Sequence, residues 1–90
     1  MKCIDINANI PNEKKPEFYQ NKIQFINELT NQDGYVDFKE DLRKDFHIVI
    51  TIEDEKKCNE FMNSDHFHFF QGALKTISHN IEIKTYSTEI

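Results

Sequence analysis

The sequence predicts an α+β domain in which helices pack on one face of an antiparallel β-sheet. Apolar and polar residues alternate in separate short runs, at the period of a β-strand. Between these runs, apolar residues recur at the spacing of helices that bury one side. The chain has 90 residues, of which 38% are hydrophobic and 12% aromatic. This length and composition predict a single domain over residues 1–90 with a core of its own.

The first predicted elements are a strand over residues 3–10 and a helix over residues 17–30. The strand places four apolar residues on one face, namely Ile4, Ile6, Ala8 and Ile10. Pro11 ends the strand because it lacks a backbone donor, and Pro16 suits the first turn of a helix. The helix has one apolar side, formed by Phe18, Phe25, Ile26 and Leu29. It is therefore expected to cover an apolar surface.

Two strands are predicted to follow the turn at Asn31-Gln32-Asp33-Gly34, where the Asp-Gly pair supplies a position of positive φ. They cover about residues 35–41 and 45–52. The second alternates strictly, with four apolar residues on one face: Phe46, Ile48, Ile50 and Ile52. The short connection through Leu42-Arg43-Lys44 predicts an antiparallel hairpin.

Two helices and a last strand complete the predicted order. Residues 53–63 form a short helix with acidic residues in its first turn, which favours its dipole. Ser64 and Asp65 are typical of a new helix start, and this second helix runs to about residue 78. Its core side repeats at helical spacing, with Phe67, Phe70, Leu74 and Ile77. Residues 81–90 alternate again and predict the final strand.

The order strand, helix, strand, strand, two helices, strand predicts the ferredoxin-like split-βαβ fold, βαββααβ. Its helices would cover one face of the sheet. The other face carries a mixture of polar and apolar residues that a chain of this size cannot cover by itself. We therefore expect a homodimer that forms through this face.

Charge and composition exclude several classes of function. The formal net charge is −5, and Lys and Arg form no basic stripe. A phosphate backbone would be repelled, so we expect no nucleic-acid partner. The N-terminus lacks a long apolar run, so we expect no membrane span and a cytoplasmic protein. Cys3 and Cys58 are expected to be free thiols, because neither belongs to a CxxC pair.

The segment NSDHFHFF, residues 63–70, contains the candidate chemistry. On a helix, His66 lies at the boundary of the apolar side, whereas His68 points to solvent. Histidines at i and i+2 diverge and cannot share a metal ion, so no metal site is expected. His66 could act as a hydrogen-bonding group or general base, or it could simply pack at the helix junction. Phe69 points away from the core and would suit a contact or a pocket rim.

Two segments together resemble the antibiotic biosynthesis monooxygenase (ABM) family: DGYVDF, and HIVITIEDEKKCNEFMNSDHFHFF. Gly34 matches the glycine that starts the second strand of that family. Ser64, His66 and Phe67 match its Ser-x-His-Phe element. The resemblance covers nearly the whole chain. It implies a dimeric α+β barrel and oxygenation of a quinol or aromatic polyketide-like substrate without metal, flavin or other cofactor.

The resemblance also implies site residues. His66 would be the catalytic base or hydrogen-bond donor, in a pocket between sheet and helices. The substrate-binding positions implied are Asn7, Tyr35, Ile52, Phe67, Phe70 and Gln71, with Asn7 and Tyr35 as polar groups and the phenylalanines as walls.

Some positions depart from the family pattern. A related heme-degrading branch has an Asn, a Trp and a His at three positions. Asn7 matches the first, but Ile52 and Gln71 replace the Trp and the His, so heme degradation is the least expected activity. Ile52 and Phe61 also replace residues that many monooxygenases of the family carry. A non-catalytic module that binds a small molecule or a partner on the same dimeric barrel is therefore the alternative.

Overall fold

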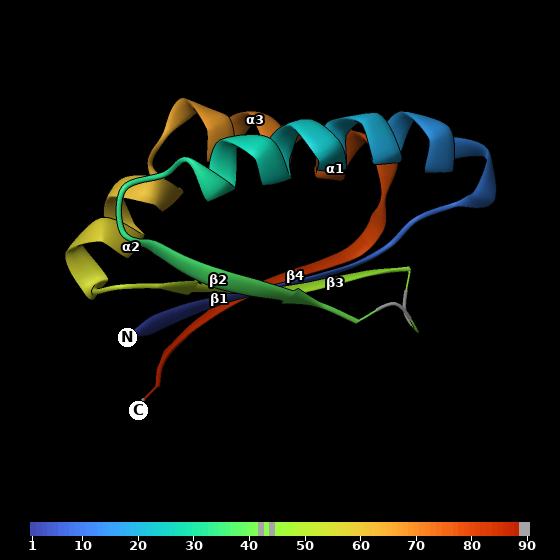
Figure 1. The fold of residues 1–90 in the computed structure, drawn as a ribbon. Helices are drawn as coiled ribbons and strands as arrows, with labels where there is room; N and C mark the ends of the chain where they lie inside the picture. Colours follow the sequence, from blue (N-terminus) through green and yellow to red (C-terminus); the bar gives the residue numbers. More distant parts are fainter. Residues whose placement is uncertain (42, 44, 89–90) are drawn as a thin grey trace.

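The computed structural model describes residues 1–41, 43 and 45–88 of the chain. Helices form one layer and a four-stranded antiparallel sheet forms the other (Figure 1). The elements in chain order are β1 (Lys2–Asn9), a 3₁₀ turn (Asn12–Lys14), α1 (Lys15–Thr30), β2 (Tyr35–Glu40), β3 (Phe46–Ile52), α2 (Glu55–Met62), α3 (Asp65–Ile77) and β4 (His79–Ser87).

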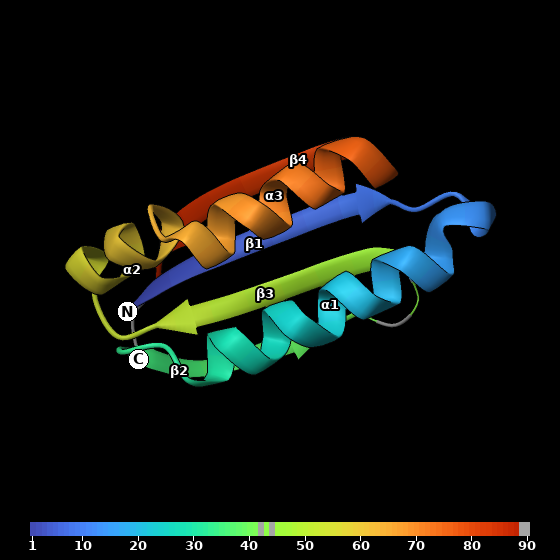
Figure 2. The ribbon, with the colours of Figure 1, turned by 90° about the horizontal axis from the view of Figure 1, so that it is seen from above.

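The sheet has the strand order β2-β3-β1-β4, with every neighbouring pair antiparallel. Seen from above, α1 lies over the β3 side of the sheet and α3 over the β1–β4 side, as Figure 2 shows. This arrangement confirms the predicted ferredoxin-like split-βαβ fold. Strands β1 and β3 are central, which explains why their sequences alternate most strictly.

The predicted boundaries are close to the observed ones. Helix α1 begins at Lys15, two residues before the predicted start, with Pro16 in its first turn. Strand β4 begins at His79 rather than residue 81, and Asn80 in it has a positive φ of 54°. The predicted turn through Leu42-Arg43-Lys44 includes positions 42 and 44, which lie outside the described residues.

Gly34 adopts the predicted positive φ, at 86°, in the turn before β2. A Cβ at this position would lie 2.6 Å from Cδ of Lys57, whose side chain crosses the turn. The Gly34 carbonyl accepts a hydrogen bond from the Glu53 N–H at 2.7 Å. Glycine is required here because the backbone conformation and the close Lys57 stem both exclude a side chain.

The space between the sheet and the helices is filled by aromatic side chains. Phe25 of α1 stacks on Phe70 of α3, with ring centroids 4.0 Å apart and planes 11° apart. Phe46 of β3 meets Phe70 edge-on at 5.9 Å, and Phe61 meets Phe67 edge-on at 5.4 Å. These offset and edge-to-face pairs are the favourable aromatic geometries. They close the interior with side chains of the chain itself.

Two side-chain caps set the path from α2 into α3. Asp54 accepts a hydrogen bond from the Lys57 N–H at 2.8 Å and caps α2. The Ser64 hydroxyl accepts from the Phe67 N–H at 3.2 Å and donates to the Phe61 carbonyl at 2.6 Å. Ser64 therefore ends one helix and starts the next, as its position in the sequence predicts. This junction places His66 in the first turn of α3.

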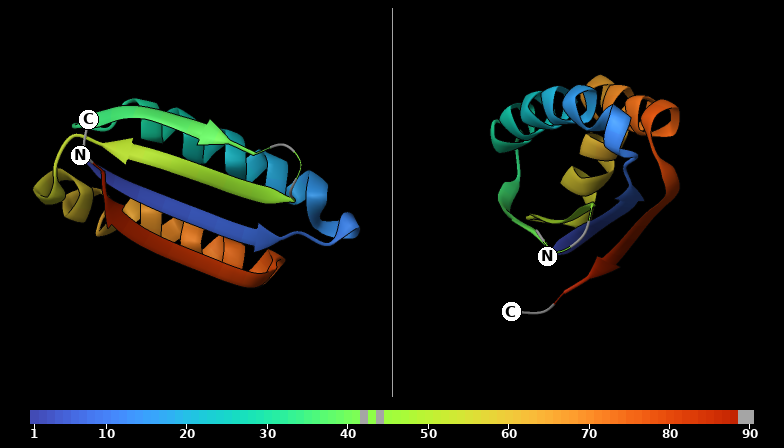
Figure 3. Two further views of the ribbon diagram at one scale, coloured as in Figure 1. Left: turned by 90° about the horizontal axis from the view of Figure 1, so that it is seen from below. Right: turned by 90° about the vertical axis from the view of Figure 1, so that its right-hand side faces the viewer.

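In the described part of the chain no helix covers the opposite face of the sheet (Figure 3), and the start of β1 pairs with the end of β4 at one end of it, Lys2 with Ser87. Exposed apolar side chains on this side of the molecule include Met1, Val36 and Tyr86. We call this surface the open sheet face. No helix among the described residues is long and apolar enough to cross a membrane.

Candidate functional site

His66 lies where the first turn of α3 meets the last turns of α1. Its Nδ1 is 2.8 Å from Oε2 of Glu28, and just over half of its side chain is exposed, at 54%. Glu28 is the less exposed partner, at 29%. The carboxylate therefore fixes the imidazole from the helix α1 side and leaves the rest of the ring toward solvent.

A hollow of about 320 Å³ borders this pair. It is lined by Gln24, Glu28, Asp65, His66 and Phe69. Phe69 is 65% exposed, which confirms the prediction that it points away from the core. A second hollow of about 420 Å³ continues along α1 and α3 on the other side of Phe69. We call the first hollow, with its five lining residues, the His66 groove.

The His66 groove could support proton transfer. Because Glu28 contacts Nδ1, the Nε2 atom is the ring nitrogen left for a ligand, and it has no protein partner in the part of the chain that the structure describes. An imidazole oriented by a carboxylate is the usual construction of a general base. The exposed ring of Phe69 offers an aromatic surface beside it.

Other predicted site residues lie elsewhere, and several fill the core. Ile52, Phe67 and Phe70 are buried in the packed interior. Tyr35 pairs with Ile52 across β2 and β3 and is half-buried against the core. Its burial, and next the nearby Asp37 carboxylate, raise the pKa of Tyr35. Ile52, Phe67 and Phe70 belong to the core cluster and Tyr35 packs against it, so these residues contribute to a filled interior.

Neither Asn7 nor Gln71 lines the His66 groove. Asn7 is on the open sheet face, opposite His47 of β3 and Glu82 of β4. Helix α3 lies on the far side of the sheet from that face, so the structure does not bring Asn7 and His66 together. Gln71 is half-buried on α3, next to Phe70.

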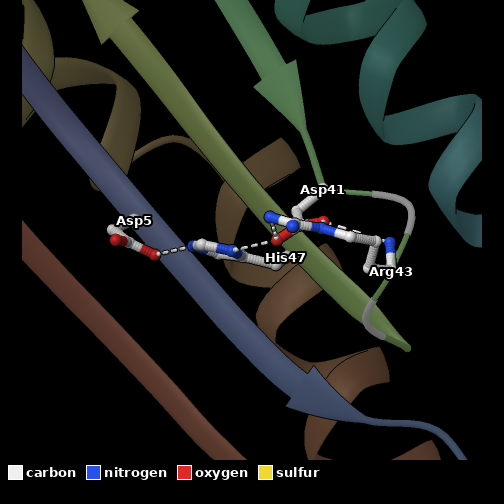
Figure 4. A network of polar contacts seen from close by, with 4 residues as sticks. All are labelled: Asp5, Asp41, Arg43 and His47. Carbon is white, nitrogen blue, oxygen red and sulfur yellow. Dashed lines mark hydrogen bonds and ion pairs between the residues drawn. The ribbon is translucent and has the colours of Figure 1, made fainter.

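A second polar cluster lies on the open sheet face, and the sequence interpretation missed it (Figure 4). His47 Nε2 lies 2.8 Å from Oδ1 of Asp5, and its Nδ1 lies 3.9 Å from Oδ2 of Asp41. Nδ1 is buried and has no hydrogen-bond partner among the described residues. The Arg43 side chain and backbone N–H both donate to Asp41, and these hydrogen bonds lower the pKa of that carboxyl. The strand register, which creates the cluster, cannot be read from the sequence.

The two cysteines are free, as predicted, and both are buried. Cys3 lies with its Sγ 3.8 Å from the Thr51 hydroxyl. Burial raises the pKa of the Cys58 thiol. Within the described ranges, no three His, Cys, Asp or Glu side chains are placed to share a metal ion.

Neither a known family model nor a curated protein matches the sequence. Solved structures do match the fold. One is a candidate antibiotic biosynthesis monooxygenase from Deinococcus radiodurans, with a TM-score of 0.87 and 16% identity over 100% of this chain and 94% of that one. The chain has the ABM fold.

Two further neighbours extend this comparison. SnoaB, a cofactor-independent oxygenase from Streptomyces nogalater, matches with a TM-score of 0.81 and 14% identity over 99% of this chain and 93% of that one. A dimeric ferredoxin-like protein from Jannaschia sp. CCS1 matches with a TM-score of 0.77 and 11% identity over 97% and 98% of the two chains. At such low identity, the likeness establishes the shared ABM fold alone.

Proposed function

We propose that the chain is a small cofactor-independent monooxygenase that oxidises a quinol or aromatic polyketide-like compound with dioxygen. The observation that carries this proposal is the contact of His66 with Glu28 beside the exposed ring of Phe69. The ABM fold, which the chain shares with a cofactor-independent oxygenase, supports it. His66 is the proposed catalytic base, and Phe69 supports the aromatic ring of the substrate.

The proposed chemistry starts with transfer of a phenolic proton to Nε2 of His66. The resulting anion gives one electron to dioxygen, and the two radicals combine into a carbon-bound peroxide. The peroxide forms at a ring carbon that carries one hydrogen, takes back the proton held by His66, and loses water to leave a carbonyl at that carbon. One oxygen atom then ends in the product and the other in water, together with the carbon-bound hydrogen and the phenolic proton. The role of the protein is to orient the substrate and hold its proton.

Oxygen uptake with a panel of neutral quinols tests this activity. We expect the wild type to consume oxygen faster than autoxidation and His66→Ala to lose most of that excess, since a positioned base contributes about 10²–10⁴-fold. His68→Ala is the matched control, because His68 is exposed only two residues away on the same helix. Equal uptake by wild type and His66→Ala would remove His66 as the base.

We also propose that the chain forms a homodimer through the open sheet face. Apolar side chains on a face without helices support this assembly, and a neighbour with the same fold is dimeric. Val36→Arg should dissociate the dimer, because Val36 is 41% exposed on that face. Ile23→Arg, at an exposed position on helix α1, should not. A monomeric mass of the wild type in light scattering at micromolar concentration would refute the dimer.

A non-catalytic binding module is the second candidate, and one observation favours it. Ile52, Phe67 and Phe70 fill the interior where the resemblance implies a substrate pocket. A packed interior leaves the outer His66 groove as a site for binding without chemistry. If quinols bound at the groove and caused no oxygen uptake above autoxidation, this second function would replace the first.

A further inference from the structure

Apart from histidine, the ionisable side chains that line the His66 groove and the neighbouring hollow are all carboxylates. Glu28 and Asp65 line the groove, and Glu17 lines the neighbouring hollow beyond Phe69. Among the described residues, no Lys or Arg lines either hollow. Glu17 has Lys14 at 4.0 Å, and Glu28 has His66 at 2.8 Å. Asp65 has no ion-pair partner in the described part of the chain, so its carboxylate remains available to a ligand.

Phe69 adds an aromatic face to these carboxylates. It is 65% exposed and lines both hollows, so it stands between them. The face of an aromatic ring attracts a cation with about 0.5–1 kcal/mol at exposed sites. Carboxylates at the same place add Coulomb attraction of about 1 kcal/mol at 4 Å in water, and more where solvent is partly excluded. The two attractions act on the same ligand group, because an ammonium over the Phe69 ring would lie beside the carboxylates of the groove.

We infer that the His66 groove selects an aromatic ligand that carries an ammonium or similar organic cation, held between Phe69 and the Asp65 carboxylate. The inference rests on the proposed function only for the position of the ligand at His66, and it adds the chemical class of that ligand. The phenolic end lies toward His66, and the cationic end lies toward Asp65. An aromatic carboxylate is rejected, because it would meet Glu28 and Asp65 and the net charge of −5.

Three phenols of nearly equal size test this selection: tyramine, 4-ethylphenol and 3-(4-hydroxyphenyl)propionate, which are cationic, neutral and anionic at pH 7. Each is titrated into the ¹⁵N-labelled chain, and binding is measured from amide shifts around Phe69. We expect tyramine to bind on the order of tenfold more tightly than 4-ethylphenol, which corresponds to the combined attraction above. The propionate should bind most weakly, and added salt should weaken tyramine only.

Variants separate the two parts of the site. Asp65→Asn should reduce the preference for tyramine to the part that the Phe69 ring contributes, and should leave the affinity for 4-ethylphenol unchanged. Phe69→Ala should weaken both ligands, whereas His68→Ala should weaken neither. Equal affinities for the three phenols, shifts located away from Phe69, or no binding by any of them would overturn the inference. Selective tyramine binding without oxygen uptake by any phenol would instead reject the proposed activity and leave the inference standing.

Discussion

Replacement of Phe70 by alanine tests whether the interior is closed by aromatic packing. Phe70 is 3% exposed, stacks on Phe25 at 4.0 Å and meets Phe46 edge-on at 5.9 Å. Truncation of a buried phenylalanine costs about 3–5 kcal/mol, including the cavity it leaves. Each lost aromatic pair adds about 0.5–1.5 kcal/mol beyond area burial, so the upper part of that range is expected. A domain of this size has a free energy of unfolding of about 5–14 kcal/mol, so the loss is a large fraction of it.

Phe69→Ala is the matched control for this experiment, because the neighbouring ring is 65% exposed. Its free energy of unfolding should change by no more than about 0.5 kcal/mol. Urea unfolding followed by circular dichroism gives both values, and an unchanged m-value shows that the unfolded states are comparable. If Phe70→Ala cost no more than Phe69→Ala, Phe70 would border an open pocket rather than a packed core.

Three further changes follow from local features. Gly72→Ala in α3 should raise the free energy of unfolding by up to about 1 kcal/mol, because glycine destabilises a helix relative to alanine and the new Cβ meets no atom within 4 Å. A lower melting temperature of the variant would contradict this. Ser64→Ala should cost about 1 kcal/mol in urea unfolding through loss of the α3 cap, and an unchanged midpoint would show that the cap is not needed. Burial raises the pKa of Cys58 above its ordinary 9.0, so the native thiol keeps its proton where the unfolded chain has lost it. The contribution of Cys58 to the free energy of unfolding is therefore constant below about pH 9 and falls above it. Above about pH 9 the wild type should lose more stability with rising pH than Cys58→Ala, and identical slopes would contradict this.

Much of the fold could be predicted because local patterns and tertiary packing agree. The alternation in residues 46–52 shows which side of β3 is buried, and the Asp-Gly turn and the Ser64 cap occur where the sequence indicates. Helix α1 starts two residues before the position that the sequence predicts, since a 3₁₀ turn precedes it and extends the helical backbone toward Pro11. Boundaries of this kind depend on a few local hydrogen bonds rather than on a long pattern.

The candidate site could be predicted only in part. Helical angles place His66 at the edge of the apolar side, but its partner Glu28 comes from α1, 38 positions earlier, and depends on how two helices pack. The contact of His47 with Asp5 likewise depends on the register of β1 against β3. The pocket implied by family resemblance lies between sheet and helices, whereas the hollows of the structure lie on its outer surfaces, both along the helices and on the open sheet face.

Incorporation of ¹⁸O from labelled dioxygen tests the central claim, oxygenation at the His66 groove, most directly. The wild type is incubated with a quinol that it turns over, and the product and its ¹⁸O content are measured by mass spectrometry against a protein-free control. We expect one ¹⁸O atom in the product and the other in water, with product formation lost in His66→Ala and kept in His68→Ala. Product that carries no label, or that forms as fast without protein, would contradict the claim and leave the chain as a binding module with the ABM fold.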